Sequence, residues 1–169
     1  MMNYYLNCLL LLYTITGFSQ NDGLYLDKET KETIEWLNSK LIEHQFETSK
    51  IKHIQYFESV REIKGSYYLM GEQTQHINTL VMQRVFAIPI EKINSISFED
   101  KEYNIWINIR MKNHEEAVLT SSDGENWTKV SNLPFIFSKS IDNENLRPRL
   151  KKAFEYLMKL YGNKTEEKF

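Results

Sequence analysis

The side chains that could bind a metal or transfer protons show no recognisable spacing in this chain. The four histidines are His44, His53, His76 and His114, and they form no HxH, HxxxH or HExxH pattern. Zinc sites commonly draw two or more ligands from one short motif of that kind. The sequence therefore predicts exposed or capping histidines, with no metal and no cofactor.

Nucleophilic catalysis is not indicated either. The chain has no GxSxG turn, in which a serine is held beside a base. The acidic pair Glu99 and Asp100 falls in an expected turn, where carboxylates are ordinarily solvated. The only cysteine, Cys8, lies in an apolar leader, so the remaining chain would carry no thiolate and no disulfide. We predict a non-catalytic protein, with an enzyme assembled from unremarkable residues as an alternative.

One polar strand face is predicted to bind a partner. Residues 103–112 alternate apolar and polar side chains, which is typical of a half-buried strand. The polar side carries Asn104, Trp106, Asn108 and Arg110. An aromatic ring flanked by amide and guanidinium groups is typical of interface hot spots. This face either contacts a protein or peptide, or is covered by the first helix through Trp36 and Leu37.

Two helices are expected to bracket the strands. The first covers residues 28–45, with Asp27 or Thr30 as its cap. The second begins near Pro148 and stops at Gly162. Its apolar residues recur every three or four positions and so form one stripe that must be buried. The stripe consists of Leu146, Leu150, Ala153, Phe154, Leu157, Leu160 and Tyr161.

Seven antiparallel strands are predicted between the helices. Their ranges are 51–59, 65–72, 79–88, 93–99, 103–112, 116–121 and 133–138. Short turns separate them, as in a meander, and Asp123 with Gly124 gives the strongest hairpin signal. The sequence thus predicts an α+β domain with an N-terminal helix, a bent antiparallel sheet or partly open barrel of about seven strands, and a C-terminal amphipathic helix.

This order of elements resembles that of pleckstrin-homology-like domains. The resemblance covers residues 51–161 and depends on the segments VFAIPIEKINSISFED, YNIWINIRMKN and LRPRLKKAFEYLMKLYG. It implies two bent antiparallel sheets, with the last helix plugging one end. The last helix has Phe154 and Tyr161 where such domains usually carry a Trp. Only Arg61 and Lys64 add positive charge between the first two strands, so lipid-headgroup binding is not expected.

Other architectures suit the same pattern. A helix before a curved sheet is also found in cystatin-like domains, and a meander with a terminal helix in lipocalin-like barrels. Either would favour a carrier of a small apolar ligand, held inside the sheet or in a pocket lined by Tyr67 and Tyr68. Because one fold hosts many functions, the element order does not choose among them.

Residues 1–19 read as a removable export signal. An apolar block at 4–15 precedes the small residues Gly17 and Ser19. The block is shorter than the roughly 20 residues that span a bilayer. Its ending, GFSQ, resembles signal ends common in secreted proteins of the Bacteroidota. We expect export to the periplasm or beyond, with an uncleaved anchor as the alternative because no Lys or Arg precedes the block.

After signal removal we expect a short arm at 20–27, a single domain at 28–162, a polar tail at 163–169 and no stable membrane span. The net charge is −2. Basic residues gather in 147–168, where acidic residues interrupt them and the last helix explains them. No stripe of basic and aromatic residues accompanies them, so a nucleic-acid partner is not expected. The expected partner is a protein or peptide.

Overall fold

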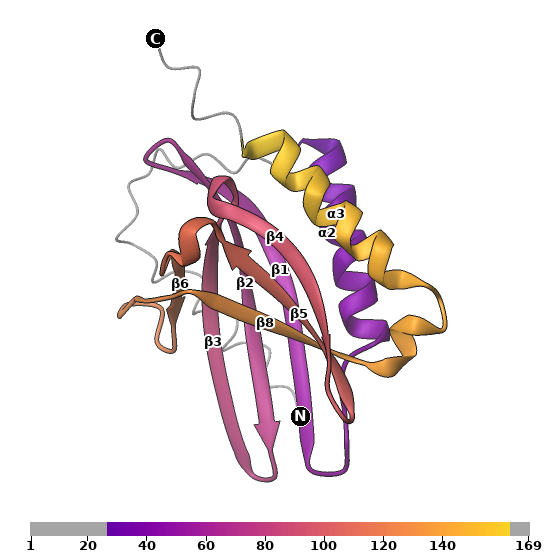
Figure 1. Cartoon of the computed structure of the whole chain (residues 1–169). Helices are drawn as coiled ribbons and strands as arrows, with labels where there is room; N and C mark the ends of the chain where they lie inside the picture. The colour runs from indigo at the N-terminus through magenta and orange to yellow at the C-terminus, as the bar shows by residue number, and fades with distance from the viewer. Residues whose placement is uncertain (1–26, 163–169) are drawn as a thin grey trace.

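The computed structural model describes residues 27–162, and Figure 1 shows two antiparallel sheets with two helices packed beside them. The helices are α2 (Lys28–Glu43) and α3 (Leu146–Tyr161). The strands are β1 (Ile51–Ile63), β2 (Ser66–Ile77), β3 (Leu80–Pro89), β4 (Ile93–Asp100), β5 (Asn104–Met111), β6 (Val118–Ser121), β7 (Thr128–Val130) and β8 (Asn132–Ser138). The predicted signal at 1–19, most of the arm at 20–27 and the tail at 163–169 lie outside the described residues.

The strands form two sheets that do not close into a barrel. Sheet A has the order β1-β2-β3-β6-β7, and sheet B has the order β4-β5-β8. The predicted meander holds for β1–β3 and for β4–β5. It also holds for β6–β7, but it is wrong between β3 and β4, which lie in different sheets, and for β6 and β8, which return to pair with β3 and β5. The chain therefore crosses between the sheets after β3, after β5 and after β7.

Eight strands form within the described residues rather than seven. The missed strand is β7, which has three residues and pairs with β6 across the predicted hairpin. Gly124 takes the positive φ that this turn requires, at 79°. Strands β1 and β2 also run four and five residues past their predicted ends at 59 and 72. Their extensions carry polar side chains on both faces, so they lack the alternation that identifies a strand.

Helix α2 begins and ends close to its predicted bounds. The carboxylate of Asp27 accepts a hydrogen bond from the backbone N–H of Thr30 at 2.7 Å, which makes Asp27 the N-cap. The helix ends at Glu43, two residues before the predicted end, with His44 as its C-cap. Its apolar stripe buries Ile34, Leu37 and Leu41 against β1.

Helix α3 packs its predicted stripe into the core. Leu146, Leu150, Phe154, Leu157 and Tyr161 are all buried. Pro148 is the third helical residue rather than the first, a position whose N–H has no intrahelical partner in any helix. Phe154 lies edge-on to Phe57 of β1, with ring centroids 5.7 Å apart. The helix thus joins an aromatic cluster that also includes Phe86 and Phe135 of the two sheets.

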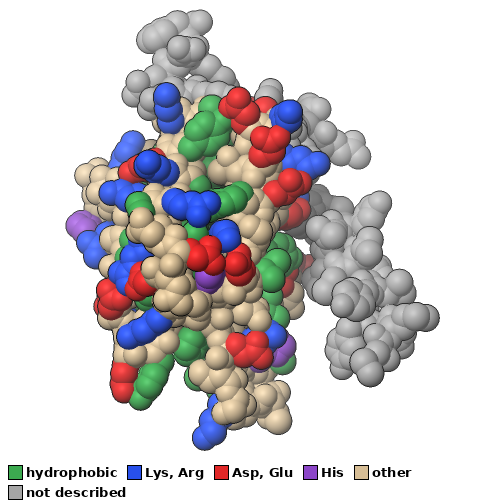
Figure 2. All heavy atoms as spheres, turned by 90° about the vertical axis from the view of Figure 1, so that its right-hand side faces the viewer, with side chains coloured by type: hydrophobic (Ala, Val, Ile, Leu, Met, Phe, Trp, Pro, Cys, Tyr) green, Lys and Arg blue, Asp and Glu red, His purple; other side chains and the backbone are tan. Residues whose placement is uncertain are grey.

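The outer surface of the helices is charged. Figure 2 looks onto this side of the molecule and shows acidic and basic side chains interspersed over it. Each helix has 16 residues, and neither is long and apolar enough to be a membrane span.

Candidate functional site

The inner face of sheet A changes from apolar to polar along its length. Cross-strand register places Phe57, Gly71 and Phe86 in one row across β1, β2 and β3. The next row is Gln55, Gln73 and Arg84, and the one after it is His53, Gln75 and Met82. The first row belongs to the aromatic core. The two polar rows line a cleft between the sheets.

Strand β8 separates this cleft from the core. It is an edge strand of sheet B, and glutamines of sheet A bind its backbone. The side chain of Gln55 donates to the carbonyl of Ile136 at 2.8 Å and accepts from its N–H at 3.0 Å. Gln73 donates to the carbonyl of Pro134 at 3.0 Å. The neighbouring Phe135 packs into the core, whereas Ile136 and Pro134 line the cleft.

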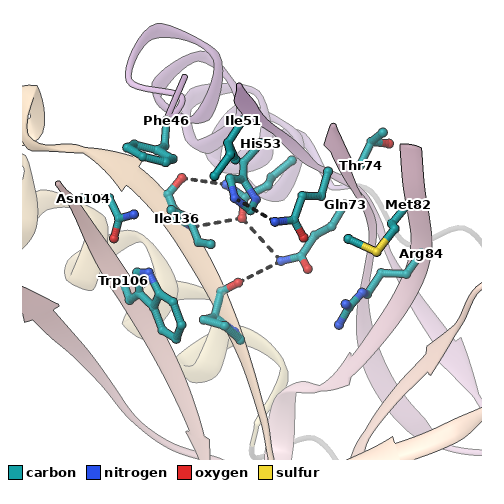
Figure 3. A pocket seen from close by; sticks show the side chains of 13 residues that line it. Phe46, Ile51, His53, Gln73, Thr74, Met82, Arg84, Asn104, Trp106 and Ile136 are labelled. Carbon is teal, nitrogen blue, oxygen red and sulfur yellow. Dashed lines mark hydrogen bonds between the residues drawn. The ribbon is translucent and has the colours of Figure 1, made fainter. Parts of the chain in front are cut away.

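The cleft has a volume of about 300 Å³, at the lower end of the range for small-molecule sites. Figure 3 shows its walls, with Trp106 and Asn104 of β5 on one side and Met82 and Arg84 of β3 on the other. Ile51, His53, Gln55, Gln73, Gln75 and Ile136 also line it, together with Phe46. The lining therefore combines amides with aromatic and aliphatic surface.

Two polar atoms beside the cleft have no partner among the described residues. They are the indole Nε1 of Trp106 and the Oδ1 of Asn104, both buried. A buried polar group without a hydrogen bond costs about 1–3 kcal/mol. The indole ring of Trp106 lies under the ammonium of Lys101, which is 4.7 Å from the ring centroid.

The four residues of the predicted binding face do not stay together. Asn104 and Trp106 line the cleft, and Trp36 instead lies under Arg149 of α3. Leu37 is in the core. The sequence also allowed the first helix to cover Trp106 through Trp36 and Leu37. The structure does not have that arrangement.

Asn108 and Arg110 lie farther along β5, outside the cleft lining. Asn108 is buried, accepts a hydrogen bond from Asn132 at 2.9 Å and donates to Glu99 at 3.3 Å. Arg110 is exposed near the end of the strand. Asn108 thus serves the structure of sheet B, and only half of the predicted face contributes to the candidate site.

Two titratable side chains line the cleft, His53 and Arg84. Burial lowers the pKa of His53 below its usual value, which favours the neutral form of its ring. Its Nε2 lies 3.4 Å from the amide nitrogen of Gln75, and its ring contacts that of Phe46 at 6.0 Å between centroids. Arg84 is exposed. The arrangement can bind through hydrogen bonds and ring contacts.

The cleft adjoins a free strand edge. Strand β6 pairs with β3 only at residues 85–87, so residues 80–84 pair with β2 on one side and with no described strand on the other. Leu80, Val81 and Met82 expose 56%, 56% and 41% of their surface. A groove runs along this edge beside Thr120 and Thr128. Exposed apolar strand edges are templates for pairing with another chain.

One group of side chains among the described residues could hold a metal ion. It consists of Glu43, His44 and Glu144, whose ligand atoms lie within 4.8 Å of one another. No short histidine motif predicts this group, because Glu144 is about a hundred residues from Glu43 and His44 in the sequence.

No family model, curated protein or solved structure matches this chain. Its class is therefore defined by the structure alone: an α+β protein of two antiparallel sheets with a polar cleft between them.

Sequence reasoning missed most of the cleft. Gln73 and Gln75 fall beyond the predicted end of their strand, and Arg84 was not singled out. The alternation of Gln73 and Gln75 is the signal that could have extended that strand and placed both amides on one face. The binding of Gln55 to the backbone of β8 has no comparable signal, because it depends on how the two sheets cross.

Proposed function

We propose that this protein is an exported, non-catalytic binding module that docks an extended peptide segment of a protein partner in the bacterial envelope. The segment would pair with the free edge of β3 and direct alternate side chains towards the cleft beside Trp106. The observation that carries the proposal is that residues 80–84 pair with no described strand on the edge away from β2 and adjoin the cleft through Met82 and Arg84.

Strand geometry supports this mode of binding. Met82 and Arg84 lie on the same face of β3, because residues two apart point the same way. A peptide strand added beside them would send every second side chain to that face. The backbone supplies affinity in such complexes, and the adjoining pocket supplies specificity.

The composition of the cleft also supports a peptide. A peptide backbone offers both donors and acceptors, which suit the amide side chains of Gln73 and Gln75 in the cleft lining. Gln55 already pairs with the backbone of Ile136 at the wall of this cleft, and a bound peptide would add contacts of the same kind. Trp106 would provide the aromatic anchor typical of a hot spot.

Export is part of the proposal and is supported by the order of apolar and small residues in 1–19. The pleckstrin-homology-like relationship is likewise proposed. Two antiparallel sheets followed by a C-terminal helix support it, whereas the return of β6 to sheet A weakens it. The proposed binding mode does not depend on that relationship.

Site-specific crosslinking in intact cells tests the proposal. A photo-reactive residue replaces Met82 in one variant and Tyr103, which is 70% exposed and outside the cleft lining, in another. We expect one peptide segment to crosslink at position 82 and not at position 103. Equal capture at both positions would contradict the proposal.

A synthetic peptide of the captured segment then measures affinity. The variant Trp36→Phe/Trp127→Phe leaves Trp106 as the only tryptophan, so its fluorescence reports the cleft. We expect saturable binding with a spectral shift, weakened about tenfold or more by Met82→Asp. The matched control is Ile42→Asp on α2, which removes an exposed apolar side chain outside the cleft. Unchanged affinity in Met82→Asp would rule out the β3 edge.

The second candidate function is a carrier for a small polar molecule. It is favoured by the volume of the cleft, about 300 Å³, and by its amide lining. Such a ligand would depend on Trp106 and Gln75 but not on the edge of β3. Native mass spectrometry of protein purified from its host would then show a bound small molecule that Trp106→Ala loses and Met82→Asp retains.

A further inference from the structure

The end of α2 and the start of α3 meet at a histidine between two carboxylates. His44 is the C-cap of α2 and is 4% exposed. Its Nε2 lies 3.4 Å from a carboxylate oxygen of Glu144 and 3.9 Å from one of Glu43. This Nε2 is buried and makes no hydrogen bond within the described residues.

The spacings from His44 Nε2 are close to those of a tetrahedral metal ion, and all three ligand atoms lie within 4.8 Å of one another. Zinc binds histidine nitrogen and carboxylate oxygen at about 2.0–2.2 Å, which places tetrahedral ligands roughly 3.3–3.6 Å apart. The distance from Nε2 to the Glu144 oxygen falls in that range, and the distance to Glu43 exceeds it by less than half an ångström. Glu43 and Glu144 have side chains 49% and 39% exposed, so an ion can reach them from solvent and retain a water ligand.

The other ring nitrogen of His44 is already fixed. Its Nδ1 lies 2.8 Å from the Oγ of Ser140, in the turn before α3. A proton on Nδ1 that is donated to Ser140 leaves the lone pair of Nε2 directed at the carboxylates. Metal-binding histidines ordinarily have their second nitrogen held in this way, which sets the tautomer and the ring orientation.

The two carboxylates of the group outnumber the one ammonium that contacts them, that of Lys40. Lys40 donates to the second oxygen of each carboxylate, at 2.5 Å from Glu43 and 3.3 Å from Glu144. It therefore orients both groups and leaves their first oxygens facing His44. Glu43 is the last residue of α2, where the helix dipole opposes a negative charge and favours a positive one.

We propose that Glu43, His44 and Glu144 form a binding site for a divalent transition-metal ion such as Zn²⁺. The ion would join the C-terminal end of α2 to the start of α3, with Ser140 and Lys40 as supporting residues. Imidazole and carboxylate together suit zinc and its neighbours in the first transition row better than Ca²⁺ or Mg²⁺. The site is separate from the proposed peptide cleft, since the two share no lining residue.

Titration of the metal-free protein with Zn²⁺ alone tests the proposal. Isothermal calorimetry should give one ion per chain, and the melting temperature should rise with Zn²⁺ concentration. Glu144→Gln should weaken binding by about 10- to 100-fold while keeping the fold, because that side chain is partly exposed. His44→Gln should abolish binding. Glu47→Gln is the matched control, because Glu47 pairs with Lys52 away from the group.

A second readout follows the ring itself. The ¹⁵N resonance of His44 Nε2 should move on addition of Zn²⁺, while that of Nδ1 remains typical of a protonated nitrogen. The proposal is overturned if no saturable binding occurs, if Glu144→Gln binds as tightly as the natural protein, or if Zn²⁺ moves only the resonances of His76 or His114. The third result would assign the ion to an exposed histidine.

Discussion

The hydroxyl groups of Thr30 and Tyr161 lie 2.6 Å apart although 131 residues separate them in the chain. Thr30 is in the first turn of α2, and Tyr161 is the last residue of α3. The Tyr161 hydroxyl also donates to Asp27, the cap of α2, at 3.1 Å. This contact joins the beginning of one helix to the end of the other.

Removal of that hydroxyl should destabilise the protein. Tyr161→Phe leaves Thr30 buried without this partner, and the expected loss is about 1–2 kcal/mol in the free energy of unfolding. Urea denaturation measures it as a lower midpoint with an unchanged slope. The control is Tyr103→Phe, a 70% exposed tyrosine, which should change stability by less than about 0.5 kcal/mol. Equal effects of the two substitutions would contradict the role given to Tyr161.

Replacement of Gln55 should lower the free energy of unfolding more than replacement of Gln75, which lines the same cleft. Gln55→Met keeps the size of the side chain but leaves the N–H and carbonyl of Ile136 without their partner. We expect a loss of about 2–3 kcal/mol. Gln75→Met is the matched control, because Gln75 lines the same cleft without binding β8, and it should cost less than about 1 kcal/mol. Thermal and urea unfolding of both variants make the comparison.

Gly71 provides room for the aromatic core. A Cβ atom at this position would press on the carbonyl oxygen of Tyr56 and on the ring of Phe86, well inside van der Waals contact. Gly71→Ala should therefore cost about 3 kcal/mol, as overpacking of a tight core does. Gly124→Ala meets no atom within 4 Å, so it should cost only the strain of a positive φ, about 1–2 kcal/mol. A smaller loss in the free energy of unfolding for Gly71→Ala than for Gly124→Ala would show that the core rearranges to accept the added methyl group.

Arg147 should set the acid dependence of one ion pair. It donates to Asp100 at 2.6 and 2.9 Å and thereby lowers the pKa of Asp100 below its usual value. Because the folded pKa is lowered, this pair stabilises the protein above pH about 4, and that contribution is lost as pH falls through the folded pKa. In Arg147→Gln the NMR titration midpoint of the Asp100 carboxyl should rise towards that of a free aspartate.

The control for this titration is Arg149→Gln. Arg149 lies over the ring of Trp36 on the same helix, so its removal changes the net charge equally without touching Asp100. The midpoint of Asp100 should then stay where it is in the natural protein. A midpoint that moves equally in both variants would mean that overall charge, and not the contact, controls Asp100.

The two helices could be predicted from the sequence because their apolar periodicity and caps involve only residues a few positions apart. The stripe from Leu146 to Tyr161 recurs with the helical period, and every residue that it predicted for the core is at least partly buried. Asp27 was identified as a cap because a short acceptor side chain before an amphipathic segment has few other roles. The central strand at 103–112 was predicted for the same reason, since Ile105, Ile107 and Ile109 alternate with polar residues.

The candidate sites could not be predicted in the same way. Asn104 and Trp106 were singled out, but Asn108 on the same face is taken up by hydrogen bonds to Asn132 and Glu99. The partner of Trp106 across the cleft is the polar half of sheet A, whose strand extensions have no apolar alternation. Which residues face each other across the cleft depends on strand register and on how the two sheets cross. Neither can be predicted from the sequence of a single strand.

The order of residues alone determined two amphipathic helices, most of the strands, the strongest turn and the absence of a spaced metal motif, because each depends on neighbours within a few positions. Only the tertiary structure decided that β6 and β8 return to different sheets and that β8 lies between the core and the cleft. Only the tertiary structure also brings Glu144 next to His44, from which it is distant in the sequence. The physical reason is one of range. Periodicity and capping act within a segment, whereas a site is made by side chains that only the packing of distant segments brings within hydrogen-bonding distance.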